Sequence, residues 1–268
     1  MTAPNMITCA QLLRRIGLPD APVLIDICID EDFAENPRLI PTAFRHPFKK
    51  IEHLVPALQG RKAVVICQKG KKLSQGAMAM LRTHGIDAEA LEGGVVSWAE
   101  MDGPMIPAAA LPDRPSLWVT RHRPKVDRIA CPWLIKRFVD PGGRFLFVGP
   151  SEVMNVAEKF DAIPFDVEGA ELSHGAETCS FDALLERFDL KTPALAKMAE
   201  VIRAADGTPN ATSPEAAGLL AMSVGLSRMY KDDLAQLDAA LPLYDALYRW
   251  ARDGQGERHD WATHGGTK

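Results

Sequence analysis

Residues 63–73 read AVVICQKGKKL, and this stretch decides the fold of the first half of the chain. Its first four residues predict a buried β-strand that ends on Cys67. Gly70 marks a tight loop, and a helical stretch follows the loop. Similar apolar runs at 23–27 and 88–91 predict further strands. Because strands and helices alternate, we expect an α/β domain with a parallel sheet flanked by helices.

Cys67 is the thiol to which the sequence gives a mechanism. In a tight loop successive backbone N–H groups can point inward, and the N-terminus of the next helix carries partial positive charge. Lys69, Lys71 and Lys72 add cationic side chains. Together these groups would stabilise a thiolate, an anion or the outer sulfur of a persulfide. The alternative is a small buried residue at the end of a strand, since free cysteine is often buried.

Composition limits the classes of protein that fit. The chain has 268 residues, a formal net charge of −4 and 5 cysteines. The charge argues against binding of nucleic acid by bulk attraction. An odd number of widely spaced cysteines without a CxxC pair does not fit a disulfide framework, a zinc ribbon or a thioredoxin motif. We find neither a signal peptide nor an apolar run of about 20 residues, which predicts a cytoplasmic protein outside the membrane.

A proline-rich stretch divides the chain. Residues 103–115 read GPMIPAAALPDRP, without the periodicity of a helix or strand. We therefore predict a first domain at 1–108, a linker at 109–115, a second domain at 116–252 and a disordered tail at 253–268. The second domain is expected to be mainly helical with some strands, a mixed α/β fold.

Several segments of the first half resemble the rhodanese family. These are residues 23–27 with 30–33, the segment 38–43, the loop that starts at Cys67, and 91–98 with Gly103 and Pro104. The resemblance spans about residues 6–108. It implies that Cys67 accepts sulfane sulfur and passes it on as a persulfide. It also implies a cradle of backbone N–H groups from six consecutive residues, Gln68, Lys69, Gly70, Lys71, Lys72 and Leu73.

The loop departs from the common rhodanese pattern at three positions. Gln68 and Lys72 stand where the family usually has Arg, and Leu73 stands where it has Ser or Thr. Lys is a point charge and cannot grip an oxyanion in the bidentate manner of Arg. Thiosulfate is therefore less expected as the natural donor. Sulfur transfer by Cys67 is still expected. Phosphatase-type relatives place Arg at the position of Leu73, so we do not expect phosphatase or arsenate-reductase chemistry.

The second half opens with a cationic stretch, for which we predict an oxyanion site. Its four permanent cations lie within eight residues and are Arg121, Arg123, Lys125 and Arg128. Such a cluster is costly unless it is solvated or meets an anion. The alternative is a solvated loop at the start of a helix that runs to about Phe138, with Asp127 as its N-cap.

An acidic segment further on contains a histidine and a cysteine. Glu171, His174 and Cys179 form a candidate set of transition-metal ligands, with Asp166, Glu177 or a residue near His122 to complete it. The spacing matches no compact zinc signature. The alternative is an irregular loop that ends at a helix cap on Ser180.

The second half resembles the C-terminal domain of ChrB-type chromate-resistance proteins over about residues 116–252. The resemblance is carried by the segments 118–121, 123–135, 169–174, 179–182 and 244–248. It implies the handling or sensing of chromate and supplies no catalytic residues. ChrB-type regulators carry a different N-terminal domain, so we do not transfer transcriptional regulation, and no basic recognition helix is present.

The sequence thus favours an enzyme: a rhodanese-type sulfurtransferase linked to a chromate-resistance domain that binds an oxyanion or a metal. Its expected partners are a small sulfur-containing anion or chromate, with no nucleic acid and no membrane, and a homo-oligomer is compatible with the chain. A transition metal in the second domain is the one candidate cofactor. The alternative function is a non-catalytic chromate- or metal-responsive sensor. A third hypothesis is direct reduction of chromate by Cys67 with Cys131 or Cys179.

Overall fold

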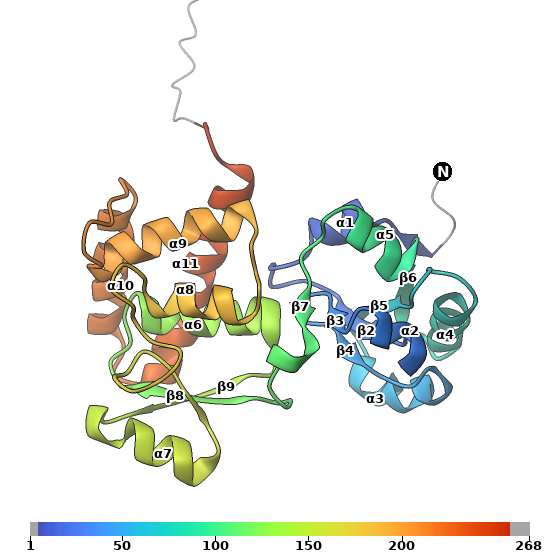
Figure 1. Cartoon of the computed structure of the whole chain (residues 1–268), viewed down its shortest axis with the longest axis horizontal. Coiled ribbons are helices and arrows are strands. Elements are labelled where there is room, and N and C mark those ends of the chain that lie inside the picture. Colours follow the sequence, from blue (N-terminus) through green and yellow to red (C-terminus); the bar gives the residue numbers. More distant parts are fainter. Residues whose placement is uncertain (1–4, 258–268) are drawn as a thin grey trace, which may run out of the picture.

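The computed structural model describes residues 5–257 as two folded halves that lie side by side (Figure 1). The predicted tail at 253–268 falls largely outside the described residues. All five cysteines are free. No helix between residues 5 and 257 is both long and apolar enough to cross a membrane.

The first half is built on a five-stranded sheet with the order β1-β6-β5-β2-β4, in which every strand pair is parallel. The strands, in chain order, are β1 (Met6–Ile7), β2 (Val23–Asp26), β4 (Phe44–Arg45), β5 (Lys62–Ile66) and β6 (Asp87–Leu91). The β-branched residues of β5 place this strand at the centre, buried on both faces. The parallel sheet predicted for this half is confirmed.

Helices cover both faces of this sheet. They are α1 (Cys9–Leu13), α2 (Asp30–Glu35), α3 (Val55–Leu58), α4 (Lys72–Thr83) and α5 (Gly94–Glu100), with a 3₁₀ segment at Phe48–Leu54. On one face Met78 and Leu81 of α4 pack against Val65 of β5. On the other face Leu12 of α1 and Trp98 of α5 contribute to the core. An antiparallel pair, β3 (Arg38–Leu39) with β7 (Ile106–Pro107), leads into the connection between the halves.

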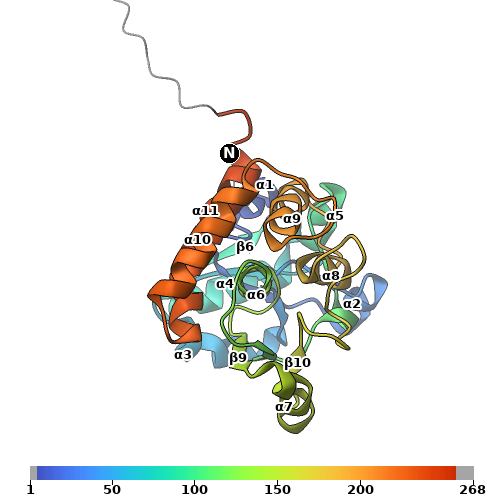
Figure 2. The same cartoon turned by 90° about the vertical axis from the view of Figure 1, so that its left-hand side faces the viewer.

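The second half is mainly helical with one small parallel sheet, as predicted. The sheet has the order β10-β8-β9, formed by β8 (Leu117–Arg121), β9 (Arg144–Val148) and β10 (Ile163–Pro164). The helices are α6 (Asp127–Leu134), α7 (Val153–Phe160), α8 (Ser180–Arg187), α9 (Pro193–Asp206), α10 (Ala216–Met229) and α11 (Asp233–Asp253). Figure 2 shows α6 end-on at the centre, and α8, α9 and α11 all contact it.

The predicted cap of α6 is wrong. Val126 is the N-cap residue, and Asp127 is the first residue of the helix. The Asp127 carboxylate instead accepts hydrogen bonds from the backbone N–H groups of Ser180 at 2.7 Å and Phe181 at 3.0 Å, so it caps α8. A carboxylate at a helix N-terminus is stabilised by the free amides and the helix dipole. The sequence could not reveal this contact because it joins residues 53 and 54 positions apart.

The two halves share an apolar interface. Gly17 has a φ of +79° and lies against the rings of Phe138 and Tyr248, where any Cβ would overlap with them. The backbone N–H of Thr42 donates to the carbonyl of Phe138 at 2.8 Å. Arg38 pairs with Asp189 at 2.5 Å. These contacts fix the halves relative to each other, while the domain boundaries proposed from the sequence stay a prediction.

Candidate functional site

Cys67 lies where the sequence analysis expects it, between the carboxyl end of β5 and the N-terminus of α4. It is 5% exposed. Its thiol donates to the Ser74 hydroxyl at 3.1 Å, and that hydroxyl donates to the carbonyl of Lys71 at 3.3 Å. Ser74 is fully buried in the first turns of α4. This chain of hydrogen bonds ties the sulfur to the start of the helix.

The turn between β6 and α5 holds the loop after Cys67. The backbone N–H groups of Val95 and Val96 donate to the carbonyls of Cys67 at 3.1 Å and Gln68 at 3.0 Å. In a trans peptide the N–H group points opposite to its carbonyl. The N–H groups of Gln68 and Lys69 therefore point away from α5.

Gly70 is required for this packing. Its φ is +63°, and a Cβ at this position would overlap with the Leu91 carbonyl and with the amides of Gly93 and Gly94. Within the described residues no protein acceptor is recorded for the backbone N–H groups of residues 68–70. Three consecutive free amides are the arrangement that binds an anion in a backbone nest.

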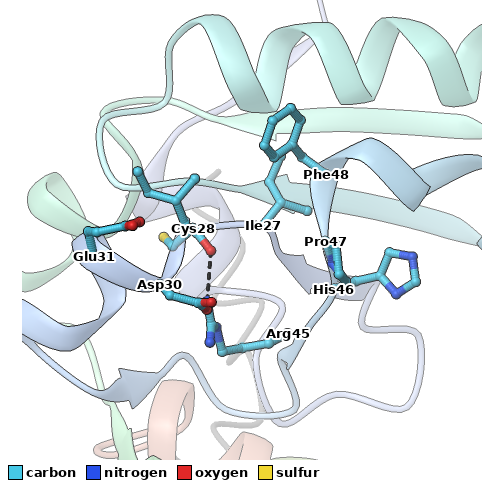
Figure 3. Close-up of a pocket in the computed structure, with 9 residues that line it drawn as sticks. Ile27, Cys28, Asp30, Glu31, Arg45, His46, Pro47 and Phe48 are labelled. Atoms are coloured by element: carbon cyan, nitrogen blue, oxygen red, sulfur yellow. Dashed lines mark hydrogen bonds and ion pairs between the residues drawn. The ribbon is translucent and has the colours of Figure 1, made fainter.

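A cavity of about 300 Å³ lies one strand away from Cys67, at the carboxyl ends of β2 and β4 (Figure 3). Cys28, Arg45 and Phe48 are among its lining residues. Arg45 donates to the Cys28 carbonyl and to Asp30, both at 2.8 Å. In open α/β sheets small ligands bind at this edge, although Cys67 itself is not one of the residues that line the cavity.

Cys28 is not a second nucleophile. Burial raises the pKa of its thiol well above the usual range, and the charge of the neighbouring Asp26 raises it further. The Asp26 carboxylate is itself buried and accepts the backbone N–H of Cys28 at 2.9 Å. Because the reactive form of cysteine is the thiolate, this raised pKa disfavours nucleophilic chemistry at Cys28.

The four cations of the predicted oxyanion site do not converge on one point. Arg123 donates to the carbonyls of Ser227 and Tyr230, and its backbone N–H donates to Asp233. Lys125 is half-buried and has no ion pair recorded between residues 5 and 257. The predicted set is therefore corrected, because the structure uses Arg123 to join the helices that surround α6.

Arg121 and Arg128 do come together, because both pair with the buried carboxylate of Asp166. Both guanidinium groups contact the same oxygen of Asp166, at 2.9 Å and 3.0 Å. Asp166 is 3% exposed. The Nε atom of Arg121 is buried and has no hydrogen-bond partner within the described residues.

His174 lies beside this pair and faces three carboxylates. Its Nε2 atom is 3.0 Å from Asp166, 3.2 Å from Asp206 and 3.5 Å from Asp127. The donor atoms of Asp127, His174 and Asp206 all lie within 4.8 Å of one another. A neutral imidazole can donate one N–H from this nitrogen, so it cannot satisfy three carboxylates.

Burial and mutual repulsion disfavour the charged forms of the carboxylates in this centre. Asp127 is 1% exposed. Burial, and then the charges of Asp206 and Asp166, raise the pKa of Asp127 to about 7. Burial likewise raises the pKa of Asp206. Carboxylates that repel each other at short range must share a proton or a cation.

The metal ligands predicted from the sequence are corrected in two of three positions. Glu171 lies on the surface and pairs with Arg187 at 3.0 Å, so it is not in the centre. Cys179 is fully buried as the N-cap of α8, where Asp182 accepts its backbone N–H at 2.9 Å. His174 and Asp166 do meet. Asp127 and Asp206, which sequence reasoning did not select as ligands, complete the centre because α6 begins and α9 ends there.

The remaining thiols are not placed for chemistry with Cys67. Cys131 and Cys179 are fully buried in the second half of the chain. Burial, and then the charge of Asp127, raise the pKa of both thiols. The structure therefore does not bring together the thiol pair that direct reduction of chromate by Cys67 would need.

The fold and the two centres define a two-part α/β protein with a cysteine loop in one half and a carboxylate–histidine centre in the other. A family model described as "ChrB, C-terminal domain" matches residues 118–251, half of the chain. The chain belongs to this family of chromate-resistance domains, which confirms the resemblance of the second half.

A curated protein and several solved structures each resemble part of this chain. Protein ChrB of Cupriavidus metallidurans is 38% identical over 134 residues, which is 49% of this chain and 39% of that protein's length. A rhodanese-related protein from Thermoplasma volcanium is 23% identical, with a TM-score of 0.33, covering 38% of this chain and 97% of that one. Thiosulfate sulfurtransferase from Pseudomonas aeruginosa is 21% identical, with a TM-score of 0.33, covering 38% of this chain and 19% of that one.

Proposed function

We propose that the first half is a rhodanese-type sulfurtransferase in which Cys67 carries sulfur as a persulfide. One observation carries this proposal: among residues 5–257, no protein acceptor meets the amides of residues 68–70, which lie at the N-terminus of α4. Free amides at a helix N-terminus stabilise a thiolate and the anionic outer sulfur of a persulfide.

The reaction has two steps, both nucleophilic displacements at sulfur. The Cys67 thiolate attacks the outer sulfur of a sulfane donor. A new S–S bond forms at Cys67 while the donor's S–S bond breaks, and the donor leaves as an anion, sulfite in the case of thiosulfate. An acceptor nucleophile then attacks the outer sulfur, the S–S bond at Cys67 breaks, and the thiolate is regenerated. Cyanide as acceptor leaves as thiocyanate.

A cyanolysis assay with thiosulfate and with polysulfide as donors tests this proposal. We expect thiocyanate formation by the wild type, none above blank by Cys67→Ser, and retained activity in the matched variant Cys28→Ser. We expect polysulfide to be the better donor, because Lys72 replaces the bidentate Arg of the common loop. Equal activity above blank in wild type and Cys67→Ser would reject Cys67 as the sulfur carrier, and no activity in the wild type with either donor would favour the alternative, a non-catalytic sensor.

The centre around His174 favours a second function, the binding of a divalent cation by the chromate-resistance domain. Three carboxylates and one imidazole offer hard oxygen donors with one nitrogen, a set that suits Mn²⁺ or Fe²⁺ better than thiolate-loving metals. The residues fit such an ion, because the donor atoms of Asp127, His174 and Asp206 already lie within 4.8 Å of one another, and Asp166 lies 3.0 Å from His174. A divalent cation would supply Lewis acidity and a fixed positive charge.

The chain's own residues hold this centre in place. The amides of Ser180 and Phe181 orient Asp127, while Arg121 and Arg128 orient Asp166. The unpartnered Nε of Arg121 supports an oxyanion such as chromate, or a small sulfur-containing anion, as a second ligand beside the cation.

Titration of the purified protein with Mn²⁺, followed by electron paramagnetic resonance, tests the metal proposal. We expect one bound ion in the wild type, loss of binding in His174→Ala and unchanged binding in Glu171→Gln. Sulfate and chromate should then bind more tightly to the loaded protein than to the metal-free one. Unchanged Mn²⁺ affinity in His174→Ala would overturn the metal site, and metal-independent anion affinity would overturn the anion's place in it.

A further inference from the structure

A cavity of about 870 Å³ lies between the two halves of the chain. Leu24 and Arg61 line it from the first half, and Arg114 and Lys136 line it from the connection and the second half. Arg61 precedes β5, whereas Cys67 follows that strand. The cavity therefore opens at the edge of the sheet opposite to Cys67, and none of the residues around His174 lines it.

The lining of this cavity is strongly cationic. It contains four basic side chains and one carboxylate, namely Arg61, Arg114, Lys136, Arg137 and Asp140. Arg137 is neutralised by a bidentate pair with Asp245 at 2.8 Å and 2.9 Å. The other three cations share the lining with a single carboxylate, and Lys136 also donates to the carbonyl of Gly143 at 3.2 Å. That carboxylate, Asp140, already accepts hydrogen bonds from Ser116 and Gly142.

Arg114 is the cation that most needs a partner. It is half-buried, and within the described residues it donates only to neutral carbonyls, those of Thr42 and Val139. No carboxylate within residues 5–257 lies at ion-pair distance from it. Burial lowers the pKa of Arg114, and the charge of Asp140 offsets this in part. A buried charge without a counter-ion destabilises a protein, so an anion in the cavity would remove a penalty that the chain itself leaves in place.

The remaining walls are apolar, which indicates the class of anion. The apolar lining residues are Leu18, Ala21, Phe44, Ala57, Pro115 and Pro141. A volume of this size is typical of sites for organic ligands. We propose that the cavity binds an organic anion, with its phosphate or carboxylate group against Arg61, Arg114 and Lys136 and its apolar body against these walls.

Such a ligand would connect the halves. Arg61 belongs to the first half and Lys136 to the second, so one anion between them adds a charged bridge to an interface that already contains the Arg38–Asp189 pair. Binding would therefore raise the melting temperature of the full chain. This inference goes beyond the proposed function, since it involves neither the thiol nor the metal centre.

Calorimetry on the full chain with phenyl phosphate, inorganic phosphate and benzyl alcohol tests the inference. We expect phenyl phosphate to bind most tightly, phosphate more weakly and benzyl alcohol not at all. Arg61→Gln and Lys136→Gln should each weaken phenyl phosphate about ten-fold, the effect of one hydrogen bond to a charged group. Arg144→Gln, an exposed arginine on β9 outside this cavity, is the matched control.

Three results would overturn the inference. One is the absence of phenyl phosphate binding by a protein that melts cooperatively. The second is an unchanged affinity in both Arg61→Gln and Lys136→Gln. The third is equal affinity for phosphate and phenyl phosphate, which would exclude a role for the apolar walls. None of these outcomes depends on cyanolysis by Cys67 or on Mn²⁺ binding at His174.

Discussion

The cysteine loop and the His174 centre are built in opposite ways. The loop after Cys67 is continuous in sequence, and a single strand-loop-helix unit creates its geometry. The His174 centre collects one side chain each from α6 and α9 and two from the loop between β10 and α8, over 80 positions of sequence between 127 and 206. The comparison teaches that continuous motifs reveal their chemistry from local rules, whereas dispersed centres require the fold.

The largest expected effect is at Gly70, on which the continuous centre depends. Gly70→Ala places a Cβ into the backbone of Leu91, Gly93 and Gly94 at a positive φ. We expect a loss of about 3 kcal/mol in the free energy of unfolding, together with loss of sulfur transfer. Urea denaturation with cyanolysis on the same samples measures both.

Gly85→Ala is the matched control for Gly70. It also has a positive φ, +77°, but nothing lies within 4 Å of its added Cβ. It should lose about 1 kcal/mol and keep its activity. Equal losses in the two variants would mean that the contact with Gly93 and Gly94 does not shape the loop.

Next in size is the effect of removing one carboxylate from the dispersed centre. Asp206→Asn should weaken Mn²⁺ binding about a hundred-fold, because it removes a charged ligand while it leaves the cap of α8 intact. Asp238→Asn, an exposed residue of α11, is the control. An equal Mn²⁺ affinity in the two variants would place the cation elsewhere.

The third prediction concerns pH. Burial raises the pKa of Asp127 to about 7, so between pH 4 and 7 the metal-free folded protein binds more protons than the unfolded chain. The contribution of Asp127 to stability is therefore greatest near pH 4 and falls as the pH rises to 7. Asp127→Ala should flatten that slope in urea titrations, and a slope of the same size in this variant would contradict the assignment.

Bound Mn²⁺ should reverse this dependence. The ion competes with the proton on Asp127, so it stabilises the protein more at pH 8 than at pH 5. Melting curves at the two pH values, with Mn²⁺ and with Mg²⁺ as a second ion, measure the difference. A stabilisation that is independent of pH would show that Asp127 is not a ligand.

The smallest effect is expected at Glu171. Glu171→Gln removes an exposed pair with Arg187 and should change the free energy of unfolding by less than about 0.5 kcal/mol. The Mn²⁺ affinity should not change. A clear loss of Mn²⁺ binding would restore Glu171 as a ligand and would require this segment to move.

The same contrast explains what could be predicted from the sequence. The parallel sheet and the place of Cys67 followed from β-branched runs and one glycine loop, because these signals are local. His174 and Asp166 were recognised as candidates from residue type alone. Asp127 was assigned as a cap of its own helix, since nothing in the sequence shows that its carboxylate reaches the amides of Ser180 and Phe181.

The cationic stretch shows a second limit. Four cations within eight residues predict an anion site, yet the fold directs Arg123 to backbone carbonyls and pairs Arg121 and Arg128 with Asp166. Meanwhile Arg61, Arg114 and Lys136, which are far apart in sequence, line one cavity. Charge in a sequence therefore indicates where cations are, while the fold decides which of them stay available.

Mass spectrometry of peptides after incubation with polysulfide tests the central claim most directly. Our account predicts the added mass of one sulfur atom on the peptide that contains Cys67, and its removal by cyanide. Peptides with Cys28, Cys131 and Cys179 should stay unmodified in the folded protein. Added sulfur on these peptides and none on Cys67 would contradict the account.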